Sequence, residues 1–101
     1  MAYRVDWSPA ALVDVEGIAE YIVRDSSSYA AAVVTRILES TRKLEQFPFA
    51  GRIVPEVGQD TIREVFAYSY RIMYRVKADR VTVATVVHGK QQFEADRLAP
   101  E

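Results

Sequence analysis

Three strand-forming segments follow one another in the second half of the chain with almost no sequence between them. Residues 61–67, 70–77 and 80–88 are rich in β-branched and aromatic side chains, and the links between them are only two residues long. Parallel neighbours need a crossover of about a dozen residues or more, so links this short require antiparallel pairing. The pattern predicts a three-stranded antiparallel meander.

Two helical segments precede the meander. Ser8-Pro9 is a typical helix start, because the serine hydroxyl can cap the first turn and proline fits the first helical position. Apolar residues recur at helical spacing up to about residue 25 and again over residues 30–44, and Pro48 ends the second segment. The last serines of the break at residues 26–28 are expected to cap the second helix. So short a break predicts an antiparallel helix hairpin.

The order of these elements predicts the fold class. Residues 3–7 alternate apolar and polar side chains, which is typical of a short strand with one covered face, and residues 49–60 read as a loop. An N-terminal strand, a helix hairpin and a meander indicate an α+β fold with the helices packed on one face of the sheet. At 101 residues, the chain 1–101 is expected to form a single domain, with a short terminal helix over residues 91–98.

Side chains along the middle strand alternate between the two faces of the sheet. The even-numbered ones are expected to point into the core: Tyr70, Ile72, Tyr74 and Val76. Arg71 and Arg75 lie on the other face, roughly 13 Å apart at ~3.3 Å per residue. This arrangement predicts two separate contacts with anionic groups, made on the face away from the helices.

Positive charge is concentrated in the same region. Residues 61–90 hold six basic side chains and two acidic ones, a local net charge of +4 in a chain whose net charge is −1. The chain's net charge argues against coating nucleic acid through charge alone, but it allows a local basic face. The basic residues expected to bind a target are Arg63, Arg71, Arg75 and Lys90. An alternative explanation for Arg75, Lys77 and Arg80 is that they solvate the outer face of the sheet or protect an edge from aggregation.

Several classes of chemistry are excluded by composition. The chain has no cysteine, so disulfides, thiolate catalysis and cysteine metal sites are ruled out, and its single histidine makes a zinc site improbable. It also lacks a glycine-rich phosphate loop, and we expect no cofactor and no metal. The N-terminus does not resemble a signal peptide, and no apolar run approaches the roughly 20 residues of a membrane span. We expect a cytoplasmic protein with no membrane partner.

One constellation could cleave RNA. That reaction needs a base for the 2′-hydroxyl, cations near the phosphate and an acid for the leaving oxygen. Glu56, Arg63, Arg71 and His88 together meet this list if the fold brings them together. A lone histidine at a strand end and a loop carboxylate are also common surface residues, so the sequence leaves both interpretations open.

The order and spacing of short motifs between residues 3 and 90 resemble the ParE/RelE toxin superfamily. The motifs are Arg52 to Glu56, Ile62-Arg63-Glu64, Tyr70-Arg71-Ile72, Tyr74-Arg75-Val76 and Val87-His88-Gly89-Lys90. The resemblance implies the toxin of a type II toxin–antitoxin pair, often described as a plasmid stabilization protein. It also implies a ParD- or RelB-like antitoxin, whose C-terminal segment wraps the toxin and through which alone operator DNA is bound. The antitoxin is expected to lie along the helix hairpin and over the basic sheet face.

The superfamily divides by target. ParE-like members poison DNA gyrase as binding proteins, whereas RelE-like members cut messenger RNA in the ribosomal A site. The lysine-rich pattern of RelE is weak here, since the only lysines are Lys43, Lys77 and Lys90 and no tyrosine follows Tyr74. This weakness favours the ParE-like branch.

A YoeB-like catalytic pattern fits better than the RelE pattern. Glu56, Arg71 and His88 resemble its glutamate, arginine and histidine, but Gly89 stands where an aromatic residue would follow the histidine. The resemblance therefore implies a gyrase inhibitor without a reaction of its own. The alternatives are a ribosome-dependent mRNA interferase, and an inactive member that only binds its antitoxin and tunes operon repression.

Overall fold

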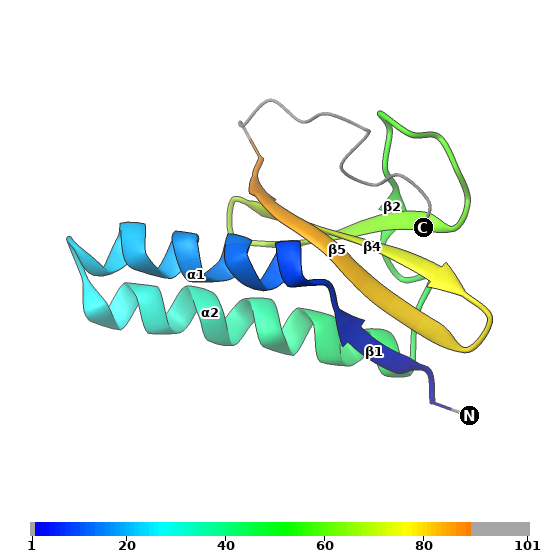
Figure 1. Ribbon diagram of the computed structural model, residues 1–101, viewed down its shortest axis with the longest axis horizontal. Helices are drawn as coiled ribbons and strands as arrows, with labels where there is room; N and C mark the ends of the chain where they lie inside the picture. Colours follow the sequence, from blue (N-terminus) through cyan, green and yellow to red (C-terminus); the bar gives the residue numbers. More distant parts are fainter. Residues whose placement is uncertain (1, 90–101) are drawn as a thin grey trace.

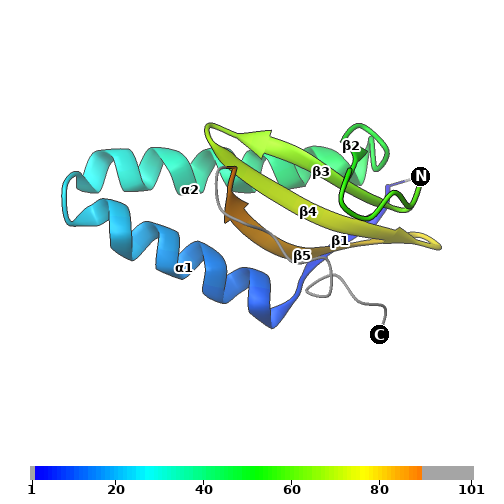
Figure 2. The same cartoon turned by 90° about the horizontal axis from the view of Figure 1, so that it is seen from above.

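The computed structural model describes residues 2–89, which form two layers, a helix hairpin on one face of a curved sheet (Figures 1 and 2). The elements in chain order are β1 (Arg4–Trp7), α1 (Pro9–Val23), α2 (Ser27–Arg42), the 3₁₀ helix η1 (Lys43–Glu45), β2 (Arg52–Ile53), β3 (Ile62–Ala67), β4 (Tyr70–Lys77) and β5 (Arg80–His88). The expected α+β class is confirmed. Between residues 2 and 89, no helix is long and apolar enough to span a bilayer. The expected helix at residues 91–98 and Lys90 lie outside the described residues.

Within residues 2–89 the sheet has five strands in the order β1-β5-β4-β3-β2. The antiparallel meander of β3, β4 and β5 is confirmed, and β1 joins it as an edge strand parallel to β5, with Arg4 opposite Arg80. The segment expected to be a plain loop contains β2, in which Arg52 pairs with Glu64 and Ile53 with Arg63. The hairpin of α1 and α2 is the crossover that parallel pairing of β1 and β5 requires.

The helix ends follow the sequence signals with two differences. Ser8 caps α1 as expected, because its Oγ accepts a hydrogen bond from the Ala11 amide at 3.1 Å. The cap of α2 is Ser26, the first serine of the break rather than the last ones, since Ser26 alone stays extended while the helix begins at Ser27. The second helical segment ends at Arg42 and tightens into η1, well before Pro48.

The main core lies between the hairpin and the sheet. The even-numbered side chains of β4 point into it as expected, and the largest of them, Tyr74, is fully buried and accepts a hydrogen bond from the Gly51 amide at 3.0 Å. Burying this aromatic ring with its hydroxyl satisfied is the usual arrangement for a core tyrosine.

A β-bulge interrupts the pairing of β4 with β5. Tyr74 lies opposite Val83, but the next residue back, Met73, lies opposite Thr85, so Ala84 is the extra residue. The start of α1 holds this bulge: Ser8 Oγ donates to the Ala84 carbonyl at 2.9 Å, and Asp14 Oδ2 accepts from Thr85 Oγ1 at 2.7 Å and from the Val86 amide at 3.0 Å. The bulge therefore belongs to the contact between helix and sheet.

Candidate functional site

The face of the sheet away from the helices is not open along its whole length. The segment that follows β2 folds back over it and forms a second small core with β3, β4 and β5. The buried members of this core are Val54, Ile62, Met73 and Val87, with Val57 packed against them. This segment covers the half of the face on which Arg71 stands.

Arg71 is a buried arginine, 7 % exposed, that binds two carboxylates. Its Nη1 and Nη2 donate to the two oxygens of Glu56, both at 2.8 Å, and its Nε donates to Glu64 Oε1 at 2.7 Å. The other oxygen of Glu64 accepts from Nε of Arg52 at 2.6 Å. We call these four residues, Arg52, Glu56, Glu64 and Arg71, the Arg71 network. Such bidentate, charge-assisted bonds are among the strongest in proteins.

The network fixes the protonation of its members. The hydrogen bonds from Arg71 hold the pKa of Glu56 at about 2, and the same bonds raise the pKa of Arg71 further above its ordinary value. At neutral pH the carboxyl group of Glu56 is ionised and its oxygens are occupied by the guanidinium. A carboxylate with so low a pKa is a weak proton acceptor.

The expectation of an outward pair of arginines is therefore only half right. Arg71 and Arg75 do lie on the face away from the helices, but Arg71 is enclosed by Glu56 and Glu64 instead of being open to an anionic ligand. Arg75 is half-buried, opposite Ile62 on β3 and Thr82 on β5. The sequence analysis did not include Glu64 in the site. Strand alternation places Glu64 on the same face of strand 62–67 as Ile62, and an acid in that position could have been recognised as a cross-strand partner for an arginine.

Arg63 does not reinforce Arg71, because it lies on the opposite face of the sheet. It pairs with Tyr74 in the register of β3 and β4. Its guanidinium donates to Asp60 Oδ1 at 2.7 Å and to the Gly51 carbonyl at 3.0 Å, and it covers the ring of Phe49 at 5.0 Å. Arg63 thus ties the ends of the covering segment to the sheet.

His88 also lies on the face opposite Arg71. Its ring meets that of Tyr70 edge to face at 5.4 Å, and it lines a groove of about 450 Å³ between α1 and the end of β5. The bulge at Ala84 places it there. Without the bulge, the register that pairs Lys77 with Arg80 would place Arg71 opposite Val86, and His88 would then lie on the same face as Arg71. With the bulge, Arg71 lies opposite Val87 and His88 lies on the other face. The structure thus joins Glu56 with Arg71 and separates both from His88.

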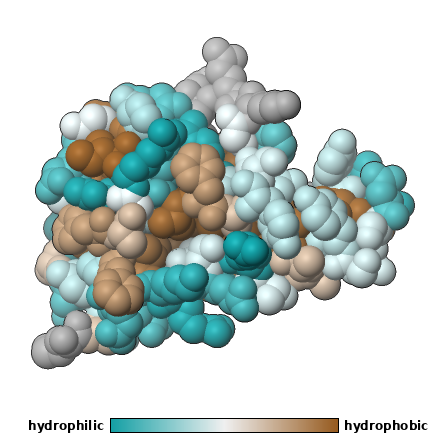
Figure 3. Space-filling model, turned by 180° about the vertical axis from the view of Figure 1, so that it is seen from behind, coloured by the Kyte–Doolittle hydropathy of each residue, from teal (hydrophilic) through white to brown (hydrophobic). Residues whose placement is uncertain are grey.

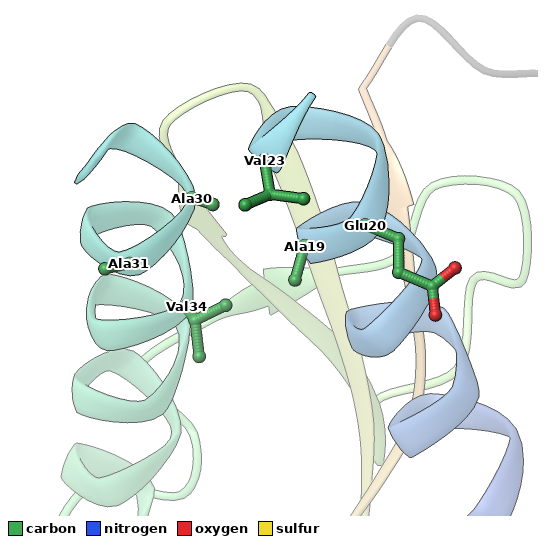
Figure 4. A pocket seen from close by; sticks show the side chains of 6 residues that line it. All are labelled: Ala19, Glu20, Val23, Ala30, Ala31 and Val34. Atoms are coloured by element: carbon green, nitrogen blue, oxygen red, sulfur yellow. The ribbon is translucent and has the colours of Figure 1, made fainter. Parts of the chain in front are cut away.

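Apolar side chains gather on the outer surface where α2 runs beside β2 and β3 (Figure 3). Between the helices, near their connection, lies an apolar crevice of about 400 Å³ (Figure 4), lined by Ala19, Glu20, Val23, Ala30, Ala31 and Val34. Ala31, Val34 and Leu38 lie at helical spacing on one stripe of α2, which leads from this crevice toward η1. Exposed apolar residues on this side of the chain are Leu38, Phe47, Phe49 and Ile53. We call the whole surface the α2 track.

Solved chains of ParE and RelE toxin systems share this fold. A chain of the chromosomal ParDE toxin–antitoxin system of P. aeruginosa superposes with a TM-score of 0.71 at 20% identity, over 86% of this chain and 96% of that one. A mutant of E. coli toxin RelE in the free state gives a TM-score of 0.66 at 19% identity, over 89% and 86%. The RelBE2 toxin–antitoxin complex of Mycobacterium tuberculosis gives 0.61 at 18% identity, over 87% and 99%.

Sequence comparison shows the family of the chain. Residues 5–93 match the family described as the ParE toxin of the type II toxin–antitoxin system parDE, so the chain belongs to the ParE toxin family. It is 36% identical over 91 residues to Y4kP of Sinorhizobium fredii, named as a candidate toxin, covering 89% of this chain and 92% of that protein. The resemblance to the ParE/RelE superfamily is confirmed.

Proposed function

We propose that the protein is a ParE-like toxin that acts in the cytoplasm by binding DNA gyrase, without a reaction of its own, and that a cognate ParD-like antitoxin neutralises it. The observation that carries the proposal is the separation of the catalytic candidates. Glu56 and Arg71 lie on one face of the sheet and His88 on the other. Binding DNA gyrase requires no such convergence.

RNA cleavage would require these groups to act on one phosphate. A general base and a general acid must each lie within hydrogen-bond reach of the reacting oxygens, about 2.6–3.2 Å. Here the sheet separates the histidine from the arginine, and the pKa of Glu56, about 2, makes it a poor base at neutral pH. The mRNA interferase remains the second candidate because Glu56 and Arg71 are in direct contact, as a YoeB-like site would have them.

The discriminating variant is His88→Gln. In a binding toxin, growth inhibition on expression without the antitoxin is expected to stay within about threefold of wild type, whereas loss of a general acid costs an enzyme typically ~10²- to 10⁴-fold.

Purified wild-type protein is added to gyrase with supercoiled plasmid and, separately, to translating ribosomes with a defined message. Trapped DNA breaks support the proposal. Cuts in the A-site codon that disappear in His88→Gln would establish the interferase instead, and a wild-type chain that never inhibits growth would leave only antitoxin binding and repression.

The α2 track is the surface that best fits the antitoxin. Contiguous exposed apolar surface marks protein interfaces, and a segment that folds on binding can follow a long, narrow track. Its margin carries Arg52, whose guanidinium lies over the ring of Phe66 at 5.3 Å, and Arg36, which lies over Tyr68 at 5.3 Å. These cations suit an antitoxin segment with acidic residues beside its apolar ones. In this proposal operator DNA is bound by the antitoxin and not by the toxin.

Leu38→Asp is expected to weaken antitoxin binding about 30-fold or more, because a buried anchor of an interface typically contributes ~2 kcal/mol or more. Leu38 is 44% exposed, so the substitution leaves the core intact. Binding is measured by calorimetry with the cognate ParD-like antitoxin. The matched control is Val13→Asp, an exposed apolar residue of α1 outside the track, which is expected to bind normally. Equal losses of antitoxin affinity in both variants, or a loss in Val13→Asp alone, would show that the antitoxin does not bind the α2 track.

A further inference from the structure

A second basic cluster lies at the other end of the sheet face, beyond the segment that covers Arg71. In the strand register Arg4 lies opposite Arg80, Arg80 opposite Lys77, and Arg75 lies two residues before Lys77 on β4. Residues directly opposite in a sheet share one face, so all four point away from the helices. With strands ~4.8 Å apart, three cations form a row about 10 Å long across β1, β5 and β4. We call Arg4, Arg75, Lys77 and Arg80 the basic corner.

Within residues 2–89, the two acids that the strand register and the turn place beside the basic corner, Asp6 and Asp79, do not cancel its formal charge. Asp6 pairs with Arg80 at 3.1 Å, but both side chains are about half exposed, at 44% and 52%, and such surface pairs contribute little. With Asp6 and the turn residue Asp79 included, the corner keeps a net charge of +2. The Arg71 network differs, since there every arginine meets a buried or bidentate carboxylate.

The row of like charges is unfavourable for folding. Equal charges directly opposite each other on neighbouring strands destabilise a sheet. Protection of a sheet edge can account for Arg4 on the edge strand β1, but not for Lys77 and Arg80, because β4 and β5 are interior strands of the sheet. Such a cost is relieved when an anion binds across the row.

The side chains present favour a phosphate backbone over an acidic protein. The centre of a protein interface is typically depleted in lysine and enriched in aromatic residues, whereas the basic corner contains only arginine and lysine with Thr82 beside them. Arginine and lysine on an exposed surface are the usual partners of phosphate oxygens, which they contact without reading sequence. The chain's overall charge of −1 means that such contacts are local and few.

We infer that the basic corner binds the phosphodiester backbone of the DNA held by gyrase. This inference rests on the proposed function, in which gyrase is the target and presents DNA to the toxin. It assigns target contact to Arg4, Lys77 and Arg80 alongside Arg75, and it leaves the Arg71 network with a structural role. The antitoxin's α2 track lies on a different surface, so the two partners have separate sites on the toxin.

The test is the salt dependence of binding. The full chain is titrated into a fluorescein-labelled DNA duplex of about 20 base pairs at KCl concentrations between about 25 and 200 mM. Fluorescence anisotropy gives the affinity at each salt concentration. Three phosphate contacts predict a slope of log K against log salt near −3, at about −0.9 per contact. Arg4→Gln, Lys77→Gln and Arg80→Gln should each reduce the slope by about 1. Arg42→Gln and Lys43→Gln remove the same charge from exposed positions on the helix side and should leave the slope unchanged.

Other outcomes have definite meanings. Equal slopes in the corner and helix-side variants would show that only net charge matters and would overturn the inference. So would binding to poly-glutamate in place of the duplex, which would assign the corner to an acidic protein. The triple variant Arg4→Gln/Lys77→Gln/Arg80→Gln should melt no lower than wild type, since it removes repulsion, and should lose toxicity while still binding the antitoxin. A wild-type chain that binds the duplex with a slope near −3 but does not inhibit growth would refute the proposed function and uphold the corner.

Discussion

Arg71→Ala is expected to lower the free energy of unfolding by about 3–5 kcal/mol, the usual cost of removing one partner from a buried ion pair. Glu64 has a fully buried side chain, and after the substitution its Oε1 loses the guanidinium that it accepts from at 2.7 Å. Glu56 loses both of its bonds to Arg71 as well, so the segment over the sheet face comes away from β4. Urea denaturation followed by circular dichroism measures the change. For a domain of this size the loss is a large part of the total stability.

Arg75→Ala is the matched control, because Arg75 lies on the same strand and face but is only half-buried. It should lose about 1 kcal/mol or less. Adding Glu64→Leu to Arg71→Ala should recover part of the lost stability, since an apolar side chain removes the uncompensated carboxylate. Equal stability of Arg71→Ala and Arg75→Ala would show that the network contributes nothing. A loss of toxicity in Arg71→Ala identifies a target contact only if the variant is folded at the assay temperature.

Local pattern was enough to predict the framework of the fold. The links around Tyr68 and Ala78 are too short for anything but antiparallel strands, and both residues take the positive φ of tight turns, at 54° and 55°. The alternation in β4 correctly assigned Tyr74 to the core, because burial on one face follows directly from a period of two. The Ser8-Pro9 start of α1 needed only local chemistry as well.

The candidate site was less predictable, because it depends on contacts between segments distant in the chain. β2 has two residues and so no periodicity to detect. Glu56 reaches Arg71 only when the covering segment folds over β4, across 15 positions of sequence. The face of His88 depends on one extra residue at Ala84, and that bulge is held by Ser8 and Asp14 from the opposite end of the chain. A single shift of this kind moves every later side chain to the other face.

Gly51→Ala is expected to destabilise the fold by about 3 kcal/mol, at the upper end of the range for overpacking a closed site. A Cβ at Gly51 would collide with the backbone carbonyl of Glu64 and lie 2.7 Å from the hydroxyl of Tyr74. Neither can yield, because Tyr74 is fully buried and Glu64 is held in the sheet by its pairing with Arg52. The chain would move β2 away from β3 and weaken the bond from Arg52 to Glu64. Thermal and urea unfolding measure the loss.

Gly17→Ala is the matched control, because the same substitution is expected to change the stability in the opposite direction. Gly17 is exposed in the middle of α1, and no neighbouring atom lies within 4 Å of the position that an alanine Cβ would take, so alanine there should stabilise the helix by roughly 0.5–1 kcal/mol. The pair separates close approach of the backbone from the general effect of replacing glycine. If Gly51→Ala were as stable as wild type, the contact between the start of β2 and β3 would have to be loose. Arg52 would then not be held rigidly against the other residues of the Arg71 network. If Gly51→Ala is strongly destabilised while Gly17→Ala gains stability, the Arg71 network depends on the docking of the two-residue strand β2, and that docking requires glycine at position 51.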